Sequence, residues 1–168
     1  TGELIVAGYR VVSGTALRSL TRLDLNTGAE AWTATFADEQ QRHGAWESVR
    51  LLQPFGTEVL LAGLHAKADA EGMQFKSYGN VAGGNALVQR LPVTALSYRA
   101  PPTVSDVSWS WSSTAYSTAK AAVPLPGGDV AALLYNELQH ASLVRLTPAA
   151  VASWGPTDYA SSHGEGTD

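Results

Sequence analysis

Hydrophobic and polar residues alternate along much of the chain, as is typical of β-strands with one buried face. In one such stretch, Leu20, Arg22 and Asp24 fall on one face and the residues between them fall on the other. Residues that favour turns separate these stretches. The pattern predicts strands over residues 3–12, 19–25, 30–36, 46–53, 57–64, 116–123 and 129–135. Helical signals are weak: a single helical turn is expected at 147–151, and residues 37–44 are expected to form a loop or one helical turn.

A short motif occurs three times. Each copy begins with an apolar run containing small residues, at 4–8, 59–63 and 130–134. An arginine followed by leucine comes next, and an aromatic residue follows eight to ten positions later. The three pairs are Arg22 with Trp32, Arg90 with Tyr98, and Arg145 with Trp154. Repeats of this kind indicate units that bury their faces only against neighbouring units.

The spacing of the repeats predicts an all-β fold of about three β-propeller-like blades. The approximate blades are residues 1–55, 56–113 and 114–160, within a single segment 1–160. A glycine-rich stretch at 65–85 is expected to be a long inserted loop. The tail 161–168, rich in Ser, Gly and acidic residues, is expected to be mobile. Trp109 and Trp111 alternate in a stretch that predicts one additional strand or an ordered excursion.

The segment from Leu20 to Trp32 resembles the blade repeat of quinoprotein (PQQ-type) propellers. It has the leucine–aspartate strand at Leu23-Asp24, the turn at Thr27-Gly28 and the tryptophan that recur in that family. The resemblance implies blade architecture, with the tryptophan packed between neighbouring blades. The later copies lack the aspartate and the Thr-Gly turn, so the resemblance implies little about cofactor binding.

Three blades are fewer than the four to eight that a closed propeller requires. An open stack would expose apolar faces and unpaired strand edges. We therefore expect other protein chains, a second copy or missing blades of a longer precursor to complete the ring. In each blade the strand resembling 59–64 is expected to be innermost, with the arginine strand next and the tryptophan strand outermost.

The composition of the chain disfavours several classes of protein and of function. The chain has 168 residues, of which 45% are hydrophobic and 15% are charged, which disfavours disorder. The net charge of −4 and the scattered basic residues argue against nucleic-acid binding. No apolar stretch reaches the ~18 residues of a membrane-spanning helix. The absence of cysteine excludes disulfides and thiolate chemistry, and is compatible with an exported protein.

No catalytic, cofactor or metal site is predicted. The histidines lack metal-ligand spacing and are interpreted as surface residues: His43, His65, His140 and His163. The repeated arginines could form an anion-binding ring, but a residue present in every unit more simply holds neighbouring units together. Trp109 and Trp111 could form a stacking platform for a glycan, or they could pack in the core or at an interface with a partner.

The leading hypothesis is therefore a non-catalytic propeller segment that serves as a scaffold or protein-interaction module. One alternative is a carbohydrate-binding, lectin-like propeller that uses Trp109 and Trp111. The other is a fragment of a quinoprotein-like or hydrolytic propeller enzyme whose remaining residues lie on other blades.

Overall fold

The computed structural model describes residues 3–13, 15–36, 48–66, 84–97, 100–136 and 141–159. Nearly all of the described part is β-strand, and every strand pairs antiparallel with its neighbours. The elements are β1 (Glu3–Val12), β2 (Thr15–Asp24), β3 (Glu30–Phe36), β4 (Ser48–Phe55), β5 (Glu58–Ala66), β6 (Gly84–Pro92), α1 (Val93–Ser97), η1 (Val104–Asp106), β7 (Trp109–Pro124), η2 (Pro126–Gly128), β8 (Val130–Asn136), β9 (Ala141–Leu146) and β10 (Ala152–Tyr159).

The strands form a three-stranded sheet of order β1-β2-β3 and a seven-stranded sheet of order β10-β9-β8-β7-β6-β5-β4. Strand β7 pairs with β6 through its first half and with β8 through its second half. We therefore distinguish three strand groups. The first is β1–β3, the second is β4, β5, β6 and residues 109–116, and the third is residues 117–124 with β8, β9 and β10.

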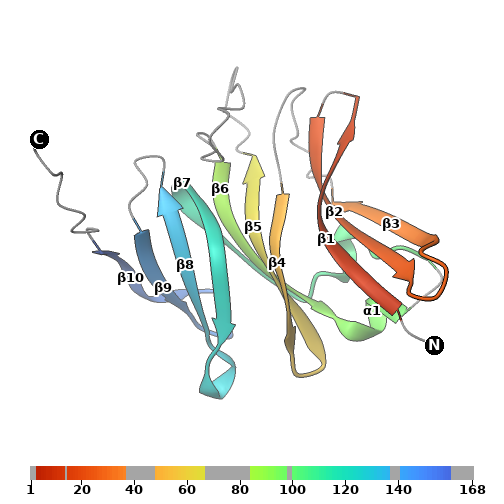
Figure 1. Cartoon of the computed structure of the whole chain (residues 1–168). Coiled ribbons are helices and arrows are strands. Elements are labelled where there is room, and N and C mark those ends of the chain that lie inside the picture. The colour runs from red at the N-terminus through yellow and green to blue at the C-terminus, as the bar shows by residue number, and fades with distance from the viewer. Residues whose placement is uncertain are drawn as a thin grey trace, which may run out of the picture.

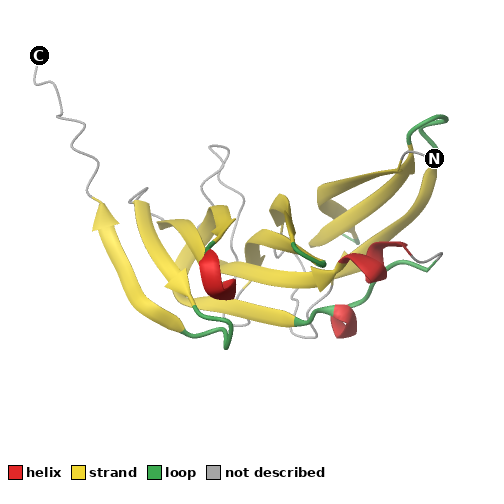
Figure 2. Ribbon diagram, turned by 90° about the horizontal axis from the view of Figure 1, so that it is seen from below, coloured by secondary structure: helices red, strands yellow, loops and turns green. Residues whose placement is uncertain are grey.

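The groups follow one another along an arc, with the first group at one end and β10 at the other (Figures 1 and 2). β1 and β2 contact β4, so the two sheets lie side by side. Two apolar clusters fill the seams. The first–second cluster joins β2 and β3 to β4, β5, β6 and α1, and includes Leu20, Trp32, Phe36, Leu61 and Leu91. The second–third cluster joins β5 and β6 to β7, β8 and β9, and includes Leu60, Val88, Val130 and Val144.

The hairpin between β2 and β3 shows how a local sequence determines a turn. The Asp24 carboxylate accepts hydrogen bonds from the backbone N–H groups of Asn26 (2.8 Å) and Thr27 (3.0 Å). The Thr27 hydroxyl accepts one from the N–H of Ala29 at 3.2 Å. Gly28 has φ +71°, a left-handed conformation that favours glycine. The hydrogen bonds that the Asp24 carboxylate accepts lower its pKa, chiefly the one from the backbone N–H of Thr27.

The structure differs from the expected strand layout in three respects. The strand at 59–64, expected to be the innermost of its unit, is the second strand of its group, because β4 pairs with its other edge. The stretch containing Trp109 and the strand at 116–123 are one continuous strand, β7. The expected unit boundaries at 55/56 and 113/114 fall inside the β4–β5 hairpin and inside β7.

The short helix α1 has no counterpart in the expected layout. Its first N–H, from Val93, donates to the carbonyl of Thr57 at 3.0 Å, which ties it to the β4–β5 turn. Ala95 and Leu96 enter the first–second cluster. A helix of five residues is unstable in isolation, so these tertiary contacts are what stabilise α1. Residues 147–150, where a single turn was expected, form a turn closed by the Ala150 N–H and the Thr147 carbonyl.

Candidate functional site

The three repeated arginines occupy the same place in each strand group. Arg22, Arg90 and Arg145 lie on β2, β6 and β9, which in each group is the strand between the one that carries the apolar run and the one that carries the tryptophan. The residues opposite them on the preceding strand are Ile5, Leu60 and Ala131, each the second residue of its apolar run. The residues opposite them on the following strand are Trp32, Trp109 and Trp154.

Register therefore pairs Arg90 with Trp109. Tyr98, which the spacing of the motif placed at this position, lies outside the described residues. The segment containing α1 and η1 is inserted between β6 and β7, and this insertion separates Arg90 from its tryptophan along the chain.

An acidic residue completes the repeated unit. Glu3, Glu58 and Asp129 stand directly before the three apolar runs. Each acid lies two residues before the residue opposite the arginine, so acid and arginine share a face of the sheet. Arg22 forms an ion pair with Glu3. Arg145 pairs with Asp129, with its Nε 2.6 Å from the carboxylate.

The central unit uses its arginine differently. Arg90 is buried and its guanidinium lies 4.2 Å from the Phe55 ring centroid and 4.6 Å from that of Trp109. The Arg90 Nη2 donates a hydrogen bond to the carbonyl of Gly128, in the turn that precedes β8. Glu58 instead accepts a hydrogen bond from Ser108. Arg90 therefore joins the second group to the third, whereas Arg22 and Arg145 pair with acids of their own groups.

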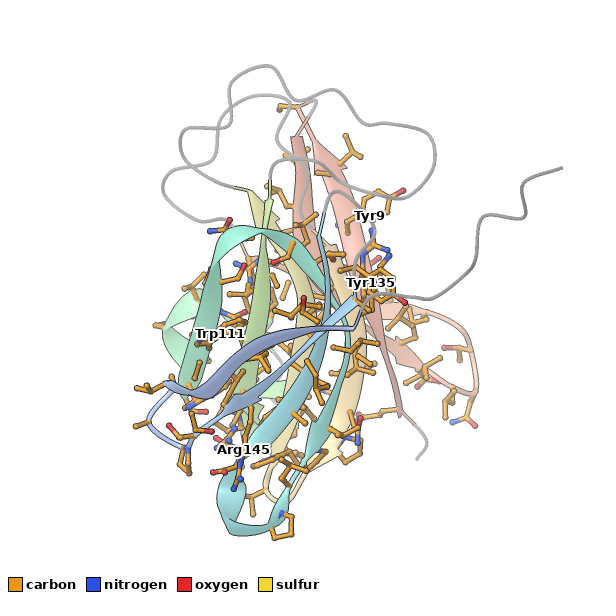
Figure 3. The ribbon with its side chains drawn as sticks, turned by 90° about the vertical axis from the view of Figure 1, so that its left-hand side faces the viewer. Tyr9, Trp111, Tyr135 and Arg145 are labelled. Atoms are coloured by element: carbon orange, nitrogen blue, oxygen red, sulfur yellow. The ribbon has the colours of Figure 1, made fainter. Side chains whose placement is uncertain are left out.

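Trp109 and Trp111 lie on the side of β7 that packs against the second–third cluster. Their neighbours across the sheet are Arg90 and Val88, and the Trp109 ring is covered by the Arg90 guanidinium. Figure 3 shows Trp111 among the strands of the second group, with Arg145 on the third group nearer the viewer. Both tryptophans are thus partly buried against this cluster, and the Arg90 guanidinium covers one face of the Trp109 ring.

The two ends of the arc expose residues whose counterparts are buried in the seams. At the first group, Leu4 and Val6 are each 44% exposed. Their counterparts in the second group, Val59 and Leu61, are 8% and 3% exposed. In the third group the same positions are held by Val130 and Ala132, both fully buried.

The opposite end shows the same contrast. On the third group, Leu133 and Leu143 are partly exposed. Their counterparts in the second group, Ala62 and Val88, lie buried in the second–third cluster. Each end face thus exposes apolar positions that are buried where two groups meet inside the arc, and the second end face also carries the Arg145–Asp129 ion pair. We call the surface bearing Leu4 and Val6 the first end face, and the surface bearing Leu133 and Leu143 the second end face.

Other chemistry is sparse in the described part of the chain. No group of three metal-ligating side chains occurs among these residues. His43, His140, His163, the stretch 37–44 and the tail 161–168 lie outside them. Of the stretch 65–85, expected to be an inserted loop, residues 67–83 also lie outside them, whereas residues 65–66 and 84–85 belong to β5 and β6, so the expected loop bounds were too wide. No helix in the described ranges is long and apolar enough to cross a membrane. No family model matches the chain, and no curated protein matches it significantly.

Proposed function

We propose that this chain is an arc of β-propeller blades that acts as a non-catalytic scaffold. In this proposal the strand groups are blades, and the end faces dock onto further blades or other protein chains. The observation that carries the proposal is the exposure of Leu4 and Val6, at positions where the other two groups bury their residues. Apolar surfaces of this kind on a soluble domain mark interaction sites.

Two further observations support the blade architecture. The second half of β7 follows directly from the first, so the last strand of one group continues into the first strand of the next. The repeated pairing of arginine with tryptophan gives each group the same internal register. The resemblance of residues 20–32 to quinoprotein blades agrees with this assignment. It carries no cofactor into the proposal, because the later units lack the aspartate and the Thr-Gly turn.

The experiment compares a double variant, Leu4→Glu with Val6→Glu, with the single variant Val93→Glu. Val93 is also 44% exposed, but it lies on α1, whose Ala95 and Leu96 pack in the first–second cluster. We expect the purified, unaltered chain to bind an apolar fluorescent dye. We also expect it to associate with further copies of itself, as measured by sedimentation velocity. The double variant should lose both properties, and Val93→Glu should keep them.

A chain that remains monomeric at all concentrations, binds no dye and responds equally to both variants would contradict the docking proposal. Turnover of a substrate by the purified chain would contradict its non-catalytic character.

A further inference from the structure

The first strands of the second and third groups each carry a basic residue at a β-bulge. Arg50 is the extra residue of β4, and Lys120 is the extra residue in the second half of β7. The two bulges are equivalent, since each lies opposite the fourth and fifth residues after the acid that precedes the apolar run of its group. A bulge re-aims a side chain and often stands beside a functional site. The repeat thus places one cation at the same irregular point of both strands.

The two cations influence each other and have no acidic partner in the described ranges. β4 contacts β7. Burial of the Lys120 ammonium, and after it the positive charge of Arg50, lowers the pKa of Lys120. Among the described residues, no carboxylate forms an ion pair with Arg50 or Lys120. Like charges without a counter-charge repel each other, and an anion bound between them would remove that repulsion.

A buried hydroxyl lies beside Lys120. Thr118 stands two residues before Lys120 and is only 4% exposed. Both residues lie on the face of β7 opposite to Ala119 and Ala122, which are buried in the second–third cluster. Thr118 pairs across the sheet with Tyr135, whose ring centre is 5.9 Å from the Lys120 ammonium. The Thr118 Oγ1 has no hydrogen-bond partner within the described part of the chain, and such a buried, unpaired hydroxyl is costly unless a ligand pairs with it.

This place remains accessible even where a neighbouring group covers the sheet. Lys120, Thr118 and Tyr135 lie on the side of the third group that forms the second end face. The second group shows what happens when that side is covered. Leu51 packs against the second–third cluster, whereas its neighbour Arg50 remains exposed. A basic side chain at this bulge therefore reaches solvent whether or not the end face is docked, and the inference below does not rest on the proposed function.

We propose that Lys120, Arg50 and Thr118 form a binding site for a phosphoryl group. A phosphoryl group carries nearly two negative charges and three or more strong acceptor oxygens, so one group can meet both cations and the hydroxyl. Lysine binds phosphate as a point charge, and arginine binds it through two parallel N–H···O bonds. A carboxylate, with a single charge and two oxygens, would leave one of the cations uncompensated. Inorganic phosphate and an organic phosphate monoester both present this chemistry.

The probes are inorganic phosphate and phenyl phosphate, titrated at constant ionic strength, with acetate and phenol as controls. Binding is measured by isothermal titration calorimetry and by NMR shifts of the Thr118, Lys120 and Tyr135 amides. We expect saturable phosphate binding, acetate binding weaker by about tenfold or more, and no binding of phenol. Tighter binding of phenyl phosphate than of inorganic phosphate would identify a monoester as the ligand, and equal or weaker binding would identify the free ion.

Two variants that change the net charge equally test the role of Lys120. Lys120→Gln should weaken phosphate binding by about 10- to 100-fold, the usual effect of losing a charge-assisted hydrogen bond. Arg10→Gln removes one positive charge from an exposed residue of β1, at the other end of the arc (Figure 1). It should change the affinity by less than about twofold, because solvent and salt screen distant charges.

Thr118→Val guards against loss of binding through misfolding, because valine has nearly the shape of threonine and lacks the hydroxyl. Removal of an unpaired buried hydroxyl should leave the urea midpoint of the free chain unchanged or raise it, while phosphate binding weakens by about 3- to 10-fold. The proposal is overturned if phosphate shows no saturable binding, if acetate binds equally well, or if Arg10→Gln weakens binding as much as Lys120→Gln. It is also overturned if Thr118→Val lowers the urea midpoint, since the hydroxyl would then already be paired within the free chain.

Discussion

Arg90 offers the sharpest test of the seam between the second and third strand groups. We consider Arg90→Met, which keeps the length of the aliphatic stem and removes the guanidinium. The matched variant is Arg145→Met, at the equivalent position of the third group. There the side chain is 44% exposed and its partner Asp129 belongs to its own group.

The structure gives the expected size of the effect. Arg90→Met loses the bond to the Gly128 carbonyl, and a hydrogen bond from a charged donor contributes about 1.5–3 kcal/mol. It also loses two stacked aromatic contacts, worth about 0.5–1 kcal/mol each. Part of this is offset because methionine requires no desolvation of a charge. We expect a net loss of about 2–3 kcal/mol for Arg90→Met and about 1 kcal/mol or less for Arg145→Met.

The assay is urea-induced unfolding followed by far-ultraviolet circular dichroism, with the free energy obtained by linear extrapolation. The comparison between the two variants matters more than either value, because both remove the same group. Equal losses, or a loss below about 1 kcal/mol for Arg90→Met, would refute the reasoning. In that case the guanidinium would not join the two groups, and the apolar cluster alone would hold the seam.

Two further outcomes follow from the same structure. Trp32 is 6% exposed in the first–second cluster, so Trp32→Ala should destabilise the fold by about 3–5 kcal/mol in the same urea assay. The control is Leu25→Ala, at a residue 56% exposed, which should lower the free energy of unfolding by less than about 0.5 kcal/mol. Similar losses for the two variants would mean that Trp32 is not buried between groups. The pKa of Asp24 is lowered by the backbone N–H groups of its turn, so its contribution to stability is present above the ordinary aspartate pKa and is lost as the pH falls through the lowered value. Unfolding of Asp24→Asn should therefore differ from that of the unaltered chain at neutral pH and converge with it in acid, and a constant difference across this range would contradict the assignment.

Local patterns predicted many of the strands because alternation and turn residues act over short distances. The strands at 3–12 and 30–36 have the predicted bounds. The prediction separated β7 into two parts, although no Gly or Pro interrupts the extended chain between Trp111 and Tyr116. Its continuity gives the third group its first strand.

The repeated motif was only partly recognised from spacing. A fixed interval after the arginine pointed to Tyr98, whereas the β-sheet register places Trp109 opposite Arg90. An insertion between paired strands changes the interval but leaves the register intact, which is why spacing failed here. The acids Glu3, Glu58 and Asp129 were missed, although a signal existed: each directly precedes an apolar run.

The sequence by itself determined the extended character of the chain, its turns and the arginines that recur in every group. These depend on backbone preferences and on the two-residue periodicity of strands, which are local properties. Only the tertiary structure decided which faces are covered and which are left open at the ends of the arc. It alone brought Arg18 to Gln89, 71 positions away, because that contact depends on how two separately formed sheets pack together.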